Sequence, residues 1–437
     1  MSALAELFVR RGVTVTGCDA NPGSTDDLRR AGIEVATGHD PRHVESARAL
    51  VITSAMRRDH PELVRARELG IPVIRRAEAL GEAVSGGRLV GFAGTHGKTT
   101  TTVMTTEALA AAGLGPTGIV GGRVGAWGGN MKPGSESLFV VEADEYDRSF
   151  LALAPTVAVV TNVEADHLDI YADLADIRGA FAQFVSGAET VVLCGDDKGA
   201  TTLDVPRGAR VIRYGMNGSS ADLRARDITP RAGGQEWEVV FEGRVLGRVA
   251  IGVPGAHNVR NALAAIASGL ALGARLEQMA PGLASFGGVE RRFERLGEAR
   301  GVTVVDDYAH HPTEIRATLE AARTAFPGRR VIAAFQPHLF SRTRDFAREF
   351  GEALAQADVV FLTEIYPSRE QPIPGVTADL IEQAVRVAGG TIGWRGDRST
   401  LADALAAAVR ANDVVLTIGA GDITRTGPEL LERLGRR

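Results

Sequence analysis

Cysteine is scarce in this sequence, since only Cys18 and Cys194 occur among 437 residues. They lie far apart and match no metal-ligand spacing, so the sequence predicts neither a disulfide framework nor a cysteine-based metal site. Each is interpreted as a small buried hydrophobic side chain. A run of about 18 apolar residues, which a membrane-spanning helix needs, is also missing, as is a cleavable apolar leader. We therefore expect a cytoplasmic protein with no membrane partner.

The sequence also lacks a large excess of either positive or negative charge. The formal net charge is -5, and acidic and basic residues are mixed along the chain, so no basic field attracts nucleic acid. Hydrophobic residues make up 44% and charged residues 24%, which is ordinary for a soluble globular protein. A chain of this length exceeds what one hydrophobic core usually supports, so two to four domains are expected.

Apolar segments alternate with amphipathic ones along most of the chain, which is typical of an α/β protein with parallel sheets. In a first domain, residues 1–87, we expect a helix over 2–12 and strands over 13–19 and 47–55. A nucleotide-binding βαβ unit begins instead with a strand and a glycine-rich turn. The sequence thus predicts a Rossmann-like domain without its first strand, either because the strand has been lost or because Met1 is an internal start.

Two further domains are expected, over residues 88–294 and 295–437. The second combines a parallel sheet with antiparallel hairpins, which short alternating segments predict between Arg210 and Val253. The third again alternates strands and helices and is Rossmann-like. Ligands bind outside the carboxyl ends of strands in open α/β sheets, so the polar clusters that end these strands are expected to converge.

The segment GFAGTHGKTTTT, Gly91–Thr102, follows a strand and precedes a helix expected over about 99–112. Backbone N–H groups of such a turn bind phosphate oxygens, a lysine reaches the terminal phosphates, and a following hydroxyl binds Mg²⁺. Phe92 stands where the eight-residue form of this motif has a glycine, and a glycine-rich turn without a ligand is the alternative. The residues that fit the phosphate-binding roles are Gly94, Gly97, Lys98 and Thr99.

Acidic residues close the next strand, and a histidine closes the one after it. VVEADEYD supplies the acids, and NVEADHLDIY supplies His167. Mg²⁺ prefers carboxylate oxygens, so one of these acids is a candidate second ligand beside Thr99. The alternatives are a solvated acidic loop and a histidine that caps or packs. The acids are Glu142, Asp144, Glu145 and Asp147.

Two polar segments follow strands of the third domain. DDYAHHPTEI holds Tyr308, His310 and His311 before a helix, and zinc is discounted there because adjacent histidines point apart. QPHLFSRTRD offers cations that could hold a carboxylate or a transferring phosphate, with surface salt bridges as the alternative. These cations are His338, Arg342 and Arg344.

Taken together, eight segments resemble the Mur ligases closely in order and spacing, and among them the branch that joins L-alanine to UDP-N-acetylmuramate. The likeness runs from about Ser2 to Gly421. The segments are AGTHGKTTTT, EADEYDRSFL, VTNVEADHLD, PGAHNVRNALAA, GVERRFE, DDYAHHPTEI, FQPHLFSRTRD and GAGDI.

This resemblance implies a UDP-sugar-binding domain, a central P-loop ATPase and a C-terminal domain that closes over the site with the amino acid. ATP and Mg²⁺ are the implied cofactors, and the implied reaction passes through an acyl phosphate. The implied substrates are UDP-N-acetylmuramate and L-alanine, and a monomer or homodimer is expected.

The resemblance also assigns roles to individual residues. It implies Mg²⁺ ligation by Thr99, Glu142 and His167. Those implied in ATP binding are Gly94, Thr95, His96, Gly97, Lys98, Thr99, Thr100, His257, Asn258, Asn261 and Arg292. Those implied in catalysis are Lys98, Glu142, His167, His338 and Arg342. Those implied in substrate binding are Asp19, Ser54 and Glu78 for the UDP sugar, and Tyr308, His310 and Arg344 for the amino acid.

Two departures from the family pattern bear on these expectations. Many members carry an arginine where this sequence has Leu339, so capture of the alanine carboxylate is expected to fall to Arg342. The family also opens with a strand and a glycine-rich loop that contacts the UDP diphosphate, and this sequence starts just beyond them. Weakened binding of the UDP sugar is therefore expected. Two alternatives stay open: a ligase that recycles a tripeptide onto the same UDP sugar, and a non-catalytic nucleotide-binding relative.

Overall fold

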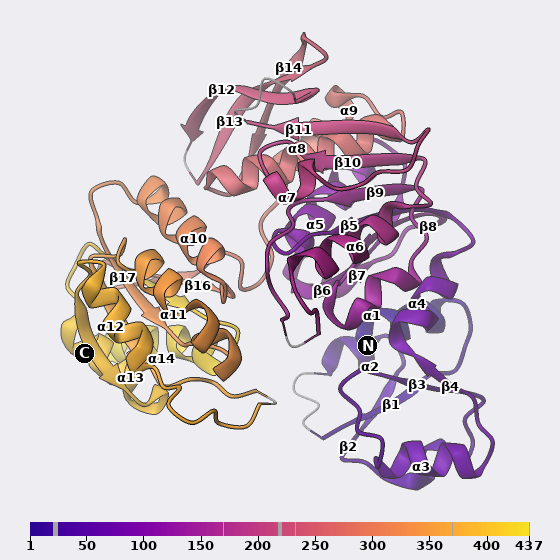
Figure 1. Ribbon diagram of the computed structural model, residues 1–437, viewed down its shortest axis with the longest axis horizontal. Coiled ribbons are helices and arrows are strands. Elements are labelled where there is room, and N and C mark those ends of the chain that lie inside the picture. The colour runs from indigo at the N-terminus through magenta and orange to yellow at the C-terminus, as the bar shows by residue number, and fades with distance from the viewer. Residues whose placement is uncertain (21–24, 169, 217–220, 232, 369, 437) are drawn as a thin grey trace. The chain divides into compact units, whose positions relative to one another are not determined.

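The computed structural model is an α/β protein, as the sequence predicts, with the elements labelled in Figure 1. It describes residues 1–20, 25–168, 170–216, 221–231, 233–368 and 370–436. Asp169, in the motif that contains His167, lies outside these ranges. The chain divides into two compact units. The first comprises Met1–Asp227, Trp237–Val249 and Arg260–Phe286, and the second comprises Ile228–Glu236, Ala250–Val259 and Gly287–Arg437.

The N-terminal part of the first unit holds two small parallel sheets, one formed by β1 and β2 and the other by β3 and β4. The predicted N-terminal helix is α1, which buries Ala3, Leu4 and Leu7 on one face. Ser2 Oγ donates to Asn130 Oδ1 at 2.9 Å and so ties this helix to a strand of the large sheet. The elements are α1 (Ser2–Arg10), β1 (Thr16–Asp19), α2 (Asp26–Arg30), β2 (Glu34–Thr37), η1 (Pro41–Val44), β3 (Leu50–Ile52), α3 (Pro61–Glu68), β4 (Val73–Arg75) and α4 (Arg76–Val84).

The large sheet has ten strands in the order β14-β13-β12-β11-β10-β9-β5-β8-β6-β7. Its centre is apolar and buried, as parallel strands covered on both faces require. Its strands are β5 (Arg88–Ala93), β6 (Pro116–Val124), β7 (Gly129–Lys132), β8 (Ser135–Glu142), β9 (Val157–Val160), β10 (Thr190–Cys194), β11 (Arg210–Gly215), β12 (Leu223–Arg231), β13 (Gly234–Phe241) and β14 (Arg244–Ile251). Its helices are α5 (Lys98–Ala111), η3 (Tyr146–Ala152), α6 (Leu174–Val185), α7 (Lys198–Thr201), α8 (Ala256–Ala271) and α9 (Leu276–Ala284).

The prediction of antiparallel hairpins throughout Arg210–Val253 is wrong for the first part of that range. Strand β11 pairs parallel with β10, and β12 pairs parallel with β11. Only β12, β13 and β14 follow one another as sheet neighbours across short turns, which antiparallel strands allow. Alternation in the sequence reports one solvated face of a strand, and it carries no information on strand direction.

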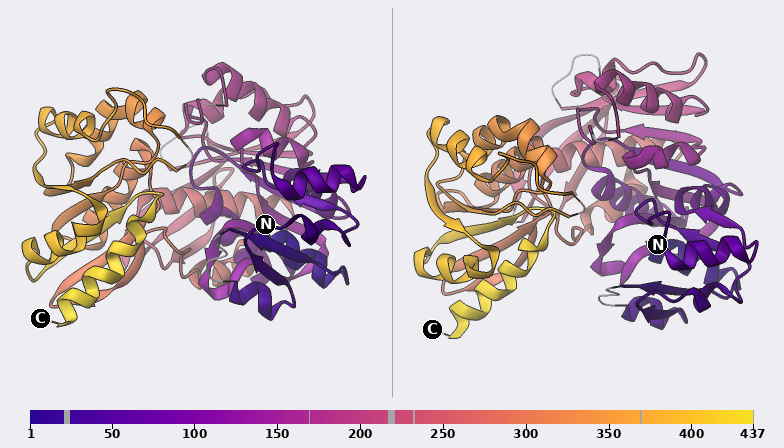
Figure 2. Two further views of the ribbon diagram at one scale, coloured as in Figure 1. Left: turned by 90° about the horizontal axis from the view of Figure 1, so that it is seen from below. Right: turned by 60° about the horizontal axis from the view of Figure 1, so that its bottom comes forward.

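The second unit is built on a six-stranded sheet in the order β15-β16-β20-β17-β18-β19. Strand β15, which the sequence did not predict, pairs antiparallel with β16 at the edge. The strands of this sheet are β15 (Glu294–Ala299), β16 (Val302–Asp307), β17 (Arg330–Phe335), β18 (Val359–Thr363), β19 (Ile392–Gly396) and β20 (Asp413–Ile418). Its helices are α10 (Pro312–Ala325), α11 (Phe340–Leu354), α12 (Asp379–Val387), α13 (Arg398–Ala408) and α14 (Thr426–Arg436), and Figure 2 shows α14 in yellow, ending at the C-terminus.

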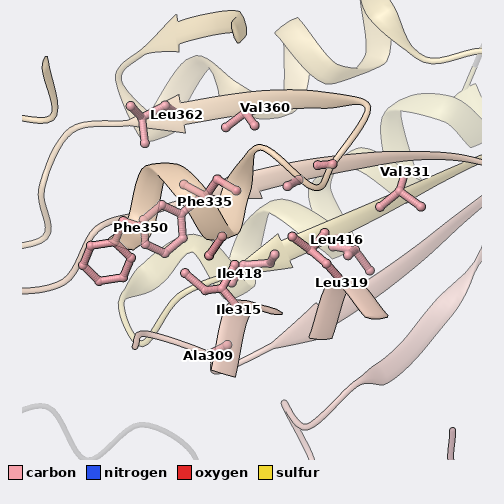
Figure 3. Close-up of a cluster of buried hydrophobic side chains, with 14 of the residues drawn as sticks. Ala309, Ile315, Leu319, Val331, Phe335, Phe350, Val360, Leu362, Leu416 and Ile418 are labelled. Atoms are coloured by element: carbon pink, nitrogen blue, oxygen red, sulfur yellow. The ribbon is translucent and has the colours of Figure 1, made fainter. Parts of the chain in front are cut away.

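Two apolar cores lie on opposite faces of this sheet. Val331, Ala333 and Phe335 of β17 belong to one core, and Ile332 and Ala334 belong to the other, as the two-residue period of a strand requires. The first core joins the sheet to helices α10, α11 and α12, and the second joins it to α13 and α14. Figure 3 shows part of the first core, with Ile315 and Leu319 of α10 and Phe350 of α11. Among the described residues, no helix has the length and apolar composition needed to cross a membrane.

Candidate active site

Three polar segments meet at one edge of the large sheet. Strand β5 pairs parallel with β8 on one side and with β9 on the other, so the carboxyl ends of all three strands face the same way. The glycine-rich loop follows β5, the acidic segment follows β8, and the segment with His167 follows β9. Parallel pairing therefore brings together residues that are about 70 positions apart in the sequence.

The glycine-rich loop is fixed by hydrogen bonds to the end of β9. Thr95 N donates to Asn162 O at 3.1 Å, and His96 N donates to Asn162 Oδ1 at 2.8 Å. Thr161 Oγ1 in turn donates to His96 O at 2.6 Å. These hydrogen bonds fix the conformation of the loop against the end of β9. Thr161 and Asn162 were not predicted, and their place directly after a buried strand is the signal that could have found them.

Lys98 is buried and forms an ion pair with Glu145. Lys98 Nζ donates to Gly94 O at 2.6 Å and lies 2.8 Å from Glu145 Oε2, while the Glu145 residue is 3% exposed. Burial alone would lower the pKa of Lys98, but the carboxylates of Glu145, Asp144 and Glu142 together outweigh it, so the pKa of Lys98 is raised. Burial alone would raise the pKa of Glu145, but Lys98 and His167 together outweigh it, so the pKa of Glu145 is lowered. Both groups are therefore charged, and the sequence had not singled out Glu145 from its acidic cluster.

Thr99 and Glu142 place two hard oxygen donors side by side. Thr99 Oγ1 donates to Glu142 Oε1 at 2.8 Å, and Gly121 N donates to Glu142 Oε2 at 2.6 Å. Oxygen donors of these two kinds suit Mg²⁺. Thr100, also predicted at the nucleotide, is buried in the first turn of α5.

His167 reaches the same cluster through Glu145. His167 Nε2 lies 3.6 Å from Glu145 Oε1 and 3.8 Å from Asp166 Oδ2, and its ring packs edge-on against Tyr146. Burial alone would lower the pKa of His167, but Glu145 and Asp166 together raise it. Glu145 thus contacts both Lys98 and His167, which were predicted from separate motifs.

Gly97 precedes α5 with φ at +82°, and a Cβ there would meet Asn261 Oδ1 at 2.8 Å. We expect Gly97→Ala to lower the free energy of unfolding by more than the roughly 1–2 kcal/mol of left-handed strain and to raise KM for ATP. The extra cost arises because Asn261 must move, and Asn261 also accepts from Thr101 Oγ1 at 3.2 Å. Urea unfolding and initial rates at varied ATP measure the two effects.

Gly113, just beyond the other end of α5, provides a matched control. Its φ is +79°, but nothing lies within 4 Å of the Cβ position. We expect Gly113→Ala to show only the backbone strain and an unchanged KM for ATP. Equal KM values in the Gly97 and Gly113 variants would contradict a role of the loop in nucleotide binding.

The residues predicted to contact adenine and ribose are divided between the two units. Asn261 belongs to the first unit and lies beside the glycine-rich loop, whereas His257 and Asn258 belong to the second. Asn258 Nδ2 donates to Pro254 O at 2.7 Å at the start of α8. His257 lies beside Gly255 in the same turn.

Two of the three residues predicted at the UDP sugar line one cavity of the first unit, with a volume of about 130 Å³. Ser54 and Glu78 line it together with Arg75, Arg76 and Arg148. The carboxylates of Glu78 and Asp147, which also line the cavity, offset part of the charge of the three arginines. Asp19, the third predicted residue, ends β1 and is not among the lining residues.

In the second unit, aromatic and cationic side chains gather after β16 and β17. The guanidinium of Arg292 lies 5.1 Å from the ring centre of Tyr308, and the rings of His310 and His338 lie 6.1 Å apart. Arg342 is buried at the start of α11. Arg344 is exposed, and its Nε donates to Oδ1 of its neighbour Asp345 at 2.7 Å.

Asp307 ends β16 and is buried. Its carboxylate accepts from Phe293 N and Ala309 N, each at 2.8 Å, yet burial raises its pKa to about 6. The folded protein therefore binds this proton more tightly than the unfolded chain, so the contribution of Asp307 to stability falls as the pH rises from about 4 to 6. We expect this loss to reach about 3 kcal/mol, the free-energy equivalent of the pKa difference.

Urea unfolding of the wild type and Asp307→Asn between pH 4 and 7 measures this effect. The variant should gain stability relative to the wild type as the pH rises, because its amide stays neutral. Asp345→Asn, at an exposed position, is the control and should show no such gain. A difference between Asp307→Asn and the wild type that is constant with pH would contradict the prediction.

The two cysteines differ in their surroundings. Cys194 is 3% exposed in β10, as predicted, and burial raises its pKa to about 11. Cys18 departs from the prediction, since it is only half-buried and its Sγ donates to Glu62 Oε1 at 3.0 Å. Burial, followed by these hydrogen bonds to Glu62, raises the pKa of Cys18 to about 12. The tertiary structure places Cys18 in a polar cluster that the spacing of residues in the sequence does not predict.

Comparison with known proteins places the chain in a family. Residues 1–88 match the model described as Mur ligase family, catalytic domain, residues 92–269 match the Mur ligase middle domain, and residues 291–421 match the Mur ligase, glutamate ligase domain. The UDP-N-acetylmuramate--L-alanine ligase of Kineococcus radiotolerans is 49% identical, over 100% of this chain and 94% of that protein. The enzyme of the same name from Streptomyces coelicolor is 45% identical, over 100% and 96%.

Solved structures show the same relationship. The UDP-N-acetylmuramate-alanine ligase MurC of Thermotoga maritima has a TM-score of 0.84 and 29% identity, and the match covers 99% of this chain and 96% of that one. A murein peptide ligase of Psychrobacter arcticus has a TM-score of 0.74 and 25% identity, with 100% and 97% covered. Because a relative is 49% identical over the whole of this chain, and three Mur ligase models match it, the chain belongs to the Mur ligase family.

Proposed function

We propose that this protein is an ATP-dependent ligase that joins L-alanine to the lactyl carboxylate of UDP-N-acetylmuramate, forming UDP-N-acetylmuramoyl-L-alanine, ADP and phosphate for peptidoglycan synthesis. The observation that carries this proposal is the 49% identity, along the whole chain, to a ligase of that name. The cluster of Lys98, Thr99, Glu142 and His167 at one sheet edge supports it, because this reaction needs cations and metal ligands beside a phosphate-binding loop.

The proposed reaction must first overcome repulsion between two negatively charged groups. A carboxylate must approach the terminal phosphate of ATP, and two unit charges about 4 Å apart repel by roughly 4 kcal/mol at an effective dielectric of about 20. In this proposal the loop amides and Lys98 hold the phosphates and offset that repulsion. Glu145 keeps Lys98 protonated and in place. The terminal phosphoryl group passes from ATP to the carboxylate oxygen, and ADP leaves. The amine of alanine then attacks the resulting acyl phosphate, forms the amide bond, displaces phosphate and loses its proton to solvent.

The residues present fit a magnesium ion. Thr99 Oγ1 and Glu142 Oε1 lie 2.8 Å apart as paired oxygen donors, and His167 offers a nitrogen at the same sheet edge. These three residues would hold the ion. When bound, Mg²⁺ would supply positive charge that offsets the charges of the phosphates and the substrate carboxylate.

The proposal extends to the remaining sites and boundaries. The cavity lined by Ser54, Glu78 and three arginines is the proposed place of the UDP sugar. Tyr308, His310, His338 and Arg342 are the proposed surroundings of alanine, and His257, Asn258 and Arg292 those of the nucleotide. Domain boundaries at residues 87 and 294, a cytoplasmic setting, and a monomer or homodimer complete the proposal.

Release of ADP by the purified protein tests the reaction. UDP-N-acetylmuramate and ATP are supplied with L-alanine, with the tripeptide, or with no amine, and the product is identified by mass spectrometry. We expect turnover when L-alanine is the amine, and none with the tripeptide or without an amine. Faster turnover with the tripeptide would assign the recycling reaction instead, and ATP binding without product from either amine would assign a non-catalytic role.

A further inference from the structure

Four potential metal ligands surround one buried carboxylate in the N-terminal part of the first unit, where Figure 1 labels β1, β2 and α3. Glu62, in the first turn of α3, is 1% exposed. Sequence positions up to 44 residues apart supply its neighbours, because the ends of the parallel strands β1 and β2 meet the start of this helix. The neighbours are Cys18, His39, His43 and His60.

The separations between three of these side chains match those within a tetrahedral zinc site. Metal–ligand bonds of about 2.0–2.3 Å at tetrahedral angles place ligand atoms about 3.3–3.8 Å apart. Cys18 Sγ lies 3.4 Å from His39 Nδ1, and His39 Nδ1 lies 3.5 Å from Glu62 Oε2. Cys18 Sγ is 3.1 Å from Glu62 Oε2, somewhat closer, because the thiol proton joins the two groups.

The remaining two histidines are placed to support such a site. His43 Nδ1 lies 2.8 Å from Glu62 Oε1, the oxygen that His39 does not approach. A hydrogen bond of this kind orients a ligating carboxylate. His60 Nδ1 lies 3.9 Å from Glu62 Oε2, and in the described part of the chain this buried nitrogen has no hydrogen-bond partner.

The charges also balance. A thiolate and a carboxylate together carry two negative charges, and neutral imidazoles add none, so one divalent ion would leave the cluster neutral. Sulfur and imidazole donors favour zinc over Mg²⁺, which prefers oxygen. His39 is partly exposed, so an ion can enter from solvent.

We propose that Cys18, His39 and Glu62 form a binding site for one Zn²⁺ ion per chain, with His60 beside the fourth coordination position and His43 orienting the carboxylate. Binding releases the thiol proton of Cys18 to solvent and forms a bond between its sulfur and the ion. The ion links β1, the segment after β2 and the first turn of α3. This site is separate from the proposed ATP site and does not depend on it.

Titration of the full-length protein with metal alone tests the site. Chelator-treated protein is titrated with Zn²⁺ by calorimetry and with Co²⁺ by absorption, both in excess Mg²⁺ so that oxygen sites are filled. The wild type should bind one ion and show a thiolate-to-cobalt absorption band. Cys18→Ser and His39→Ala should weaken Zn²⁺ binding by at least about 100-fold, and His43→Ala by about 10–100-fold, as for groups that orient a ligand.

The second cysteine supplies the matched control. Cys194→Ser should keep the cobalt band, whereas Cys18→Ser should lose it while its melting temperature without metal stays that of the wild type. A wild type that binds no Zn²⁺, or Zn²⁺ binding unchanged in both Cys18→Ser and His39→Ala, would overturn the proposal. The cluster would then be a hydrogen-bonded network without an ion.

Discussion

Replacing Lys98 with alanine is expected to lower kcat for ligation by at least about a thousandfold, the loss seen when a group that stabilises a transferring phosphate is removed. Lys98 is a buried cation at the proposed nucleotide site, where hydrogen bonds to Gly94 O and Thr95 O hold it against the glycine-rich loop. Steady-state ADP release with saturating L-alanine measures the effect. Lys198→Ala, at an exposed position on α7, should change kcat less than about twofold, since surface changes are usually near neutral.

Stability must be separated from catalysis in this variant. Without Lys98 the buried carboxylate of Glu145 loses the nearer of its two cationic partners and keeps only His167, a change that costs up to about 3–5 kcal/mol. The double variant Lys98→Ala/Glu145→Gln removes that charge and should recover most of the lost stability without recovering kcat. Recovery of kcat in the double variant, or normal product formation by Lys98→Ala, would contradict a direct role for the lysine.

Replacing Glu142 with glutamine is expected to lower kcat by about 100–1,000-fold, comparable with the loss of one group that stabilises transition-state charge. The amide oxygen can still accept from Thr99 Oγ1 or Gly121 N, so the fold should persist. The negative charge that is proposed to attract Mg²⁺ is lost, however. The Mg²⁺ concentration needed for half-maximal rate should therefore rise, and a rate titration with Mg²⁺ at fixed ATP measures it.

Glu136, at the opposite end of the same strand, gives the matched control. Glu136 lies at the surface, and its Oε1 is 3.1 Å from Nε of Arg11. Glu136→Gln should leave both kcat and the Mg²⁺ requirement unchanged. An unaltered Mg²⁺ requirement in Glu142→Gln, even with a lower kcat, would argue against ligation by this carboxylate. Equal effects in the two variants would argue that the loss is structural.

Local patterns in the sequence were sufficient for much of the fold. The apolar run at residues 88–94 predicts β5, and the helix expected at about 99–112 is α5, because buried strands and helix starts leave signals within a few residues. Strand direction left no such signal, so β11 was misread. Strand β15 was missed as well, since an edge strand with alternating exposure resembles a polar loop.

The candidate site likewise combines residues that the sequence identifies with residues that only the tertiary structure identifies. Motifs with a defined chemistry, such as the glycine-rich loop, are enough to identify Lys98 and Thr99 as candidates. The role of Glu145 depends on burial and on its distance from Lys98, which the sequence VVEADEYD does not specify. Its neighbours Asp144 and Asp147 look equally suitable in the sequence.

By itself the sequence determined the α/β class, the family resemblance and the motifs that end each strand, because these depend on residue type and short-range order. Tertiary structure alone decided which acid pairs with Lys98, which residues brace the glycine-rich loop, and that Cys18 lies among histidines around Glu62. The physical reason is that charge interactions and metal geometry act over a few ångströms in space. Chain folding, rather than spacing along the chain, sets those distances.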